Sequence, residues 1–216
     1  IIPARNESKV IGDLFASIAR QDYDRACFDV NVIVKDADDP TVAMAEAMGA
    51  RVVTVPDQCC KGDALDGFFR ALSKEEMAGY DAFVIVDADG VLSPNYLTEL
   101  NNALENDYDI FLTRKYMKNC LGDRSKRTVF SNNSALTWAM LDDLGNRYRM
   151  EKDIPLTMCG QGMMVRRSVI ETLGGWPYRT LTEDYELRLD GVLKGFRSMY
   201  WPYAVLYTEE ALSHRD

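Results

Sequence analysis

The 216-residue chain carries 25 lysines and arginines against 34 aspartates and glutamates, which gives a formal net charge of −9 at pH 7. Such an acidic balance excludes nucleic acid as a principal partner, because a phosphate backbone is bound by a basic face. The hydrophobic fraction of 47% and the charged fraction of 27% are ordinary for one globular domain with a sizeable core.

Hydrophobic patterning predicts strands alternating with helices in the first half of the chain. A strand end at residues 1–3 precedes a helix whose apolar residues recur at helical spacing. Those residues are Val10, Ile11, Leu14, Phe15 and Ile18. Further strands fall within 28–40, 50–57, 82–86 and 108–117, and the helices between them fall within 41–49, 61–79 and 95–107. Ser93 is the expected N-cap of the last helix, with Pro94 at its first position.

The second half of the chain is patterned differently. Residues 118–155 read as an insertion rather than a second domain, with a helical segment within 134–150. Residues 158–176 predict a strand and then a helix closed by Gly174 and Gly175. A helix within 179–196, opened by Thr180 or Thr182, and a strand within 198–210 are expected to follow.

This alternation predicts an α/β fold, a single domain in which helices flank a mostly parallel central sheet. Ligands bind such sheets beyond the carboxyl ends of the strands. Three of the early strands end there in polar residues, at 5–7, at 36–39, and at Asp87 with Asp89. We expect these strand ends to converge on one crevice, flanked by the 118–155 insertion.

The stretch FVIVDADGVL, residues 83–92, ends a buried strand on two carboxylates. Alternate residues of an extended chain point to the same side, so Asp87 and Asp89 can aim at one point. Two like charges held together favour a hard cation such as Mg²⁺ or Mn²⁺, which takes one or two carboxylates and fills its shell with water and substrate phosphates. A turn in which the aspartates only cap the following chain is the alternative.

The cysteines and the single histidine limit the chemistry. The cysteines are Cys27, Cys59, Cys60, Cys120 and Cys159. Their odd number and the lack of C-x-x-C spacing predict neither a disulfide framework nor a zinc site, and favour a reducing compartment. His214 is the only histidine, so a Ser-His-Asp triad is nearly excluded. Any catalysis is therefore expected to use carboxylates.

Six segments, taken in order, resemble a known family. IIPARNE, KGDALDG, VDADG, GQGMMVRR, TEDYELRLDGVLKGFR and YTEE have the order and spacing of inverting nucleotide-sugar glycosyltransferases of family 2, with the GT-A (Rossmann-like) fold. The likeness is greatest to the membrane-associated branch of cellulose, chitin, hyaluronan and poly-N-acetylglucosamine synthases. It covers the chain apart from residues 118–155, and it implies that residues 1–216 are a catalytic domain from a longer protein.

The resemblance implies a role for each motif residue. In the donor site, Pro3, Ala4 and Glu7 would contact the nucleoside, Asp36 the uracil, and Lys61 the diphosphate, with Asp87 beside them. Asp89 and Asp87 would hold Mg²⁺ or Mn²⁺. Asp184 would be the general base, next to Glu183, and Gly160, Gln161 and Gly162 would line the acceptor sugar.

The same resemblance implies partners and a location. The donor would be a UDP-sugar, and the acceptor a saccharide or a lipid-linked molecule in the synthesis of a cell-surface polysaccharide or glycolipid. The domain would be cytoplasmic, at the inner face of the cell membrane. The Q-x-x-R-W element of processive members is absent from the sequence, and the turn KDADDPT is one residue shorter than usual, which puts the register of Asp36 in question.

Most of these residues also have ordinary structural interpretations. Asp184 and Glu183 could be helix-capping acids, and Lys61 a solvated lysine at a helix start. A group of basic residues could bind an anionic carrier or a membrane surface, although a solvated loop is the simpler interpretation. The group comprises Arg114, Lys115, Lys118, Arg124, Lys126 and Arg127. Trp176 and Trp201 could stack on sugars, although Trp201 reads better as core.

Competing functions remain open at this point. DADG is similar to the nucleophile motif of haloacid-dehalogenase-like phosphatases, in which Asp87 would attack phosphorus and Asp89 would act as acid and base. That motif normally follows the first strand, whereas three strand-helix units precede it here. A nucleotidylyltransferase would need a glycine-rich first turn, which IPARNE lacks. A non-catalytic domain that binds a nucleotide-sugar is the third alternative.

Overall fold

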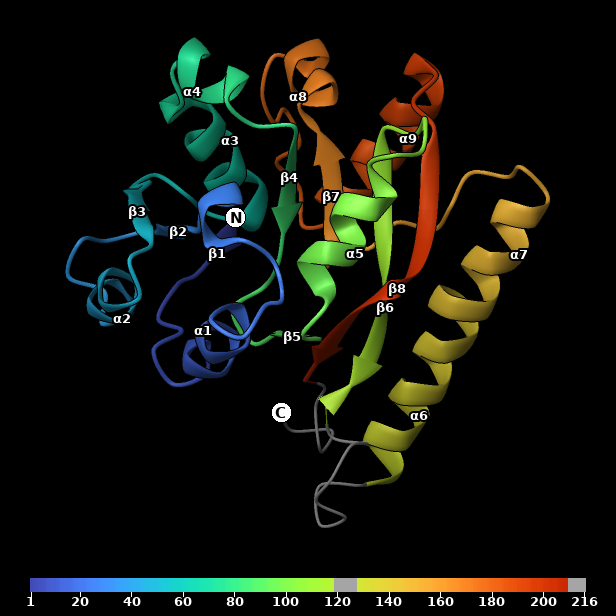
Figure 1. Cartoon of the computed structure of the whole chain (residues 1–216), viewed down its shortest axis with the longest axis horizontal. Helices are drawn as coiled ribbons and strands as arrows, with labels where there is room; N and C mark the ends of the chain where they lie inside the picture. The colour runs from blue at the N-terminus through green and yellow to red at the C-terminus, as the bar shows by residue number, and fades with distance from the viewer. Residues whose placement is uncertain (119–127, 210–216) are drawn as a thin grey trace.

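The computed structural model describes residues 1–118 and 128–209 (Figure 1). Its strands are β1 Ile2–Pro3, β2 Asn31–Val34, β3 Arg51–Thr54, β4 Ala82–Ile85, β5 Val91–Leu92, β6 Ile110–Met117, β7 Met163–Arg166 and β8 Ser198–Thr208. Its helices are α1 Ile11–Ile18, α2 Thr41–Ala47, α3 Lys61–Ala71, α4 Lys74–Ala78, α5 Tyr96–Ala103, α6 Val129–Trp138, α7 Gly145–Glu151, α8 Arg167–Leu173 and α9 Glu183–Lys194. A π-helical segment, Ala139–Leu144, joins α6 to α7, and a short 3₁₀ turn spans Arg25–Cys27.

The strands form two sheets that meet edge to edge. β1, β2 and β3 pair in parallel, and the other sheet has the order β4-β7-β6-β8-β5. The amine of Ile1 donates to the carbonyl of Val84 at 2.7 Å, and the amide of Val86 donates to the carbonyl of Ile1 at 3.0 Å. These two bonds join the sheets beside β1 and β4.

The predicted α/β domain is therefore confirmed, but the sheet is mixed. β6 and β8 are parallel, whereas β7 runs antiparallel to both of its neighbours and β5 runs antiparallel to β8. The expectation of a mostly parallel sheet is correct for β1–β3 and wrong for the second sheet. Patterning of apolar residues shows where strands lie but not their direction, which depends on the connections between them.

Two apolar clusters fill the faces of the sheet. Consecutive residues of β4 and β6 alternate between them, so the clusters lie on opposite faces. α1 and α5 contribute to the first cluster, through residues such as Leu14 and Leu100. α3, α8 and α9 contribute to the second, through Phe68, Ile170 and Leu187. The apolar spacing of the helices at 11–18 and 61–71 had predicted these buried faces.

The helix formed by α6, the π-helical segment and α7 lies along β6 and β8 (Figure 1). Its inward residues are polar: Ser131, Asp142 and Asn146 are buried. Its exposed residues include large apolar side chains, namely Leu136, Met140, Leu141, Leu144 and Tyr148. The helix is thus attached mainly through polar contacts. None of the helices in the described part of the chain is long and apolar enough to cross a bilayer.

One predicted helix cap is wrong, and a second lies at the predicted position without a capping hydrogen bond. α5 begins at Tyr96, and Ser93 instead accepts a hydrogen bond at its hydroxyl from the amide of Val205, at 3.3 Å. The cause is β5, an unpredicted two-residue strand that pairs with β8 and carries Ser93 to the sheet edge. Thr182 occupies the N-cap of α9, but its side chain makes no capping bond, so the capping-box interpretation of the α9 acids fails.

Candidate functional site

Two adjoining hollows open where β1 and β4 end. The larger hollow, of about 820 Å³, is lined by Pro3, Ala4, Arg5, Glu7, Val10, Gln58, Cys59, Cys60, Lys61, Asp87, Ala88, Asp89 and Glu209. The smaller hollow, of about 290 Å³, is lined by Cys60, Lys61, Asp87, Cys159, Gly160, Gln161, Thr180, Leu181, Glu183 and Asp184. Lys61 and Asp87 lie in both linings, so the two hollows form one continuous crevice.

The crevice brings most of the predicted residues together. Asp36 does not line it: its side chain is exposed. The neighbouring Asp39 is buried and accepts from the amides of Asn6, at 2.7 Å, and Thr41, at 2.8 Å. Burial alone would raise the pKa of Asp39, but these hydrogen bonds outweigh it and lower the pKa. Asp39 therefore holds the turn after β1, a role that sequence reasoning missed within the run DADD.

The two carboxylates after β4 have different partners. Lys61 Nζ donates to Asp87 Oδ1 at 2.5 Å, whereas Gln161 Nε2 donates to Asp89 Oδ1 at 3.2 Å. Lys118 Nζ donates to the backbone carbonyl of Asp89 at 3.0 Å. Burial raises the pKa of Asp89, and the negative charge of Asp87 raises it further. This mutual repulsion is what a divalent cation would relieve.

The residues present fit such a cation. Burial raises the pKa of Glu7, with smaller contributions from Asp89 and Asp87, so acidic groups crowd the larger hollow. Within residues 1–118 and 128–209, no group of three or more acidic, histidine or cysteine side chains has the geometry of a complete protein-only metal site. Mg²⁺ and Mn²⁺ sites of two carboxylates, completed by water and phosphate oxygens, agree with that finding.

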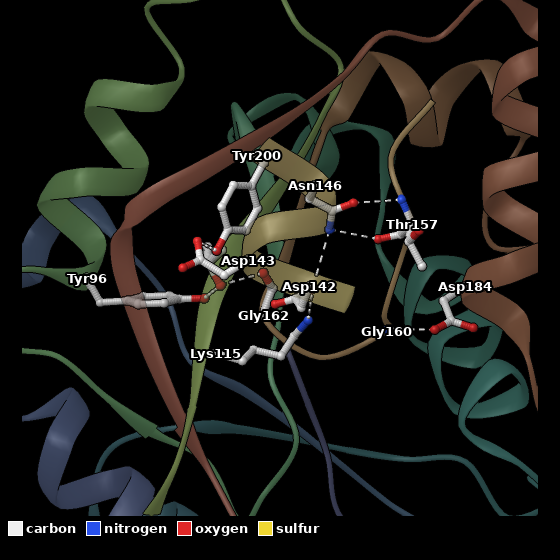
Figure 2. Close-up of polar contacts among 11 residues, drawn as sticks. Tyr96, Lys115, Asp142, Asp143, Asn146, Thr157, Gly160, Gly162, Asp184 and Tyr200 are labelled. Carbon is white, nitrogen blue, oxygen red and sulfur yellow. Dashed lines mark hydrogen bonds and ion pairs between the residues drawn. The ribbon is translucent and has the colours of Figure 1, made fainter. Parts of the chain in front are cut away.

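The first turn of α9 contributes two carboxylates, Asp184 and Glu183, to the lining of the smaller hollow. Asp184 Oδ2 accepts from the amide of Gly160 at 2.8 Å (Figure 2). Its Oδ1 accepts from the amide of Tyr185 at 2.8 Å. Glu183 is buried, with Oε1 4.0 Å from Lys61 Nζ. Burial raises the pKa of Glu183, although Lys61 acts in the opposite direction.

The ends of two side chains occupy the space beside Gly160. A Cβ there would lie 2.7 Å from Glu183 Oε1 and 3.4 Å from Lys61 Nζ. The carbonyl of Gly160 accepts from Lys61 Nζ at 2.8 Å, so this backbone unit touches both the lysine and Asp184. Gly162, with φ of +70°, lies behind the hollow, where its carbonyl accepts from the Thr113 hydroxyl at 2.8 Å.

Gln58 is a lining residue that sequence reasoning missed. Its side chain is only 6% exposed, and no partner for Nε2 exists among the described residues. Its place before the KG turn gave no distinguishing signal. An unpaired buried amide at the edge of a hollow is suited to hydrogen bonding with a ligand.

Of the basic and aromatic candidates in the described residues, Lys118 contacts the crevice through the carbonyl of Asp89, and the others lie away from it. Arg114 and Lys115 pair with Asp143 and Asp142 of the π-helical segment, whereas Arg124, Lys126 and Arg127 lie outside the described residues. Trp176 is fully buried and Trp201 packs against the first apolar cluster, so both belong to the core. Residues 128–155 contribute no lining to either hollow.

Comparisons with known proteins agree with this architecture. A model of the glycosyltransferase-like family 2 matches residues 1–215. The probable glycosyltransferase YdaM of Bacillus subtilis (strain 168) is 25% identical over 218 residues, which cover 97% of this chain and 50% of that protein. The chain thus spans about half the length of this curated relative.

Solved structures share the fold at low identity. S. aureus TarS 1-349 in complex with UDP-GlcNAc matches 97% of this chain and 58% of its own, with a TM-score of 0.67 and 16% identity. The mannosyltransferase PcManGT from Pyrobaculum calidifontis in complex with GDP-Man and Mn²⁺ matches 99% of this chain and 56% of its own, with a TM-score of 0.71 and 19% identity. Together with the match over residues 1–215, these likenesses show that the chain belongs to the glycosyltransferase-like family 2 and has the GT-A fold.

Proposed function

We propose that this domain is a metal-dependent, inverting glycosyltransferase that moves a sugar from a UDP-sugar to a hydroxyl of a saccharide or lipid-linked acceptor. The observation that carries the proposal is the continuity of the two hollows. Asp184 faces one, Asp89 faces the other, and Lys61 and Asp87 line both. A base and a site for a leaving diphosphate therefore lie on two sides of one shared space.

The larger hollow is the proposed donor site. Asp89 and Asp87 would hold Mg²⁺ or Mn²⁺, which when bound offsets the charge of a diphosphate. Lys61, already turned into the hollow, would add a second positive charge. Pro3, Ala4 and Glu7 would contact the nucleoside, and Gln58 would offer its unpaired amide. The uracil contact first expected of Asp36 remains a prediction, because its side chain lies outside the lining.

The smaller hollow is the proposed acceptor site. Asp184 would take the proton of the acceptor hydroxyl as that oxygen attacks the anomeric carbon. Attack from the side opposite the departing diphosphate inverts the anomeric configuration. Gly160 orients the base through its amide, Gln161 lines the space toward Asp89, and Glu183 stays buried behind Lys61. Gly162, predicted beside the acceptor, would support this loop from behind.

The setting of the reaction is part of the proposal. The resemblance to synthases favours a domain at the cytoplasmic face of a membrane, within a longer protein that makes a surface polysaccharide or glycolipid. Membership of family 2 removes the phosphatase reading of DADG. A non-catalytic domain that binds a nucleotide-sugar is the alternative that an experiment must separate.

A donor turnover assay tests the proposal. The purified protein would be incubated with UDP-GlcNAc, UDP-glucose or GDP-mannose, with Mn²⁺ or with EDTA, and release of the nucleoside diphosphate would be measured. We expect Mn²⁺-dependent release from a UDP-sugar, with inversion at the anomeric carbon by NMR. Tight binding of a UDP-sugar without release under any condition would instead support the non-catalytic alternative.

A further inference from the structure

We propose that Asn146 of α7 is a positioning residue for the base Asp184, acting through the loop of residues 157–160. The inference rests on the proposed function, because it needs Asp184 to be the base. Asn146 lies on the helix that lines neither hollow, so its position alone does not suggest a role in the reaction. Figure 2 shows the contacts of Asn146 with Thr157 and of Gly160 with Asp184.

Asn146 makes hydrogen bonds to both backbone polar groups of one loop residue, Thr157. Its Oδ1 accepts from the amide of Thr157 at 2.8 Å, and its Nδ2 donates to the carbonyl of Thr157 at 3.1 Å. The Asn146 side chain is fully buried. Two bonds to one residue fix the direction of the backbone as well as its distance. Arg149 Nη1 donates to the carbonyl of Pro155 at 3.2 Å, which restrains the chain just before the loop.

The Asn146 side chain is itself positioned by contact with a buried ion pair, Lys115 with Asp142. Its Nδ2 lies 3.4 Å from Asp142 Oδ1, and the same oxygen accepts from Lys115 Nζ at 3.1 Å. The Lys115 and Asp142 side chains are only 3% and 5% exposed. A buried ion pair is often no more stabilising than apolar residues of the same volume. What apolar residues would not supply is a fixed orientation for the Asn146 amide.

The loop of residues 157–160 links Asn146 to Asp184. Leu156 and Met158, on either side of Thr157, are buried in the second apolar cluster. Three residues beyond Thr157, the amide of Gly160 donates to Asp184 Oδ2. This is the one hydrogen bond to the Asp184 side chain from outside α9 in the part of the chain that the structure describes. A side chain at position 160 would meet the ends of the Glu183 and Lys61 side chains.

Two matched pairs of variants test the inference. Asn146→Leu keeps the branched shape of the side chain and removes its hydrogen bonds, and Asn133→Leu, at an exposed position of α6, is its control. Arg149→Gln loosens the loop at Pro155 with less risk to folding. Arg147→Gln, on the same helix but bonded to Asp143, is its control. Each protein would be assayed with the UDP-sugar that the wild type turns over fastest, beside Asp184→Asn.

The expected result is a split between kcat and KM. Because small misplacements of a reacting group cost much rate, Asn146→Leu should lower kcat on the order of tenfold to a hundredfold, and Arg149→Gln by less. The donor KM should stay within about twofold of wild type, because Lys61 keeps its bond to Asp87. Hydrogen exchange of residues 156–161 should rise in both variants and in neither control.

The outcomes separate the two proposals. If Asp184→Asn abolishes turnover while Asn146→Leu and Arg149→Gln match their controls, the positioning role is wrong and the proposed function stands. If Asp184→Asn turns over as fast as wild type, the proposed base is wrong and the positioning role falls with it. If Asn146→Leu melts below the assay temperature, the comparison of Arg149→Gln with Arg147→Gln decides whether the loop positions Asp184. Equal kcat values for these two variants would overturn the positioning role.

Discussion

Two sets of helices, α1 with α3 and the continuous helix of α6 and α7, are attached to the sheet in opposite ways. α1 and α3 bury apolar residues such as Ile11 and Phe68, which are fully inaccessible. The helix of α6 and α7 turns Asp142 and Asn146 inward and leaves Leu144 63% exposed. Apolar packing stabilises without direction, whereas hydrogen bonds fix particular backbone groups. α1 and α3 therefore support the larger hollow through apolar packing. The helix of α6 and α7 instead fixes, through hydrogen bonds, the loop that lines the smaller hollow.

The largest effect that follows from this comparison is kinetic. Asp184→Asn keeps the shape of the base and removes its basicity, so turnover should fall on the order of a hundredfold to ten thousandfold. Affinity for UDP, measured by calorimetry, should be unchanged because the larger hollow is intact. Asp190→Asn is the control, since it lies on the same helix and can still accept from the Tyr178 hydroxyl. Equal losses of binding and turnover would contradict the separation of the two hollows.

The next effect concerns stability in the second half of the chain. Lys115→Met leaves Asp142 buried without its cation, which should cost about 3–5 kcal/mol in urea unfolding. The double variant Lys115→Met with Asp142→Leu should recover most of that loss. Lys152→Met, at an exposed lysine of the same region, should change the free energy of unfolding by less than about 0.5 kcal/mol. A double variant as unstable as the single one would mean that the pair itself stabilises the fold.

A smaller effect is expected at Gly160, which lies between Asp184 and Lys61. Gly160→Ala places a methyl group against Glu183 and should cost about 1–3 kcal/mol of stability. Turnover should fall on the order of tenfold, since Gly160 and Asp184 must move apart. Gly12→Ala in α1 is the matched control, because its Cβ would lie 3.5 Å from Met44, an ordinary contact. Equal activity in both variants would show that the loop has room to move.

The smallest effect depends on pH and tests the first half of the chain. The lowered pKa of Asp39 means that its ionised form stabilises the folded state. That contribution is present above the unfolded-state pKa, near about 3.9, and is lost as the pH falls through the lower folded-state value. Asp39→Asn should therefore cost about 1–2 kcal/mol at pH 7 and less below pH 4. A gap for Asp39→Asn that is constant with pH would contradict the account.

The sequence predicted the features that rest on periodicity and failed where distant contacts decide. The spacing of Ile11, Leu14 and Phe15 was sufficient for α1, because a helix buries one face by its own repeat. Ser93 was misassigned because its hydroxyl bonds to Val205, in a strand far along the chain. Nothing local marks that contact.

The site shows the same division. Asp87, Asp89 and Asp184 were found because they stand in motifs, and the fold brings them to one crevice. Asn146 was not found, because a polar residue in a helix normally reads as a solvated face. Its burial depends on Thr157 and Asp142, and only the folded chain brings the three together.

The central claim is that the larger hollow binds a nucleoside diphosphate through a metal ion held by Asp89 and Asp87. Calorimetric titration of UDP into the purified protein, with Mn²⁺ and with EDTA, tests it directly on the wild type and on Asp89→Ala. The account predicts binding that requires Mn²⁺ and is lost in the variant. Equal UDP binding by the two proteins, or binding that is indifferent to Mn²⁺, would contradict it.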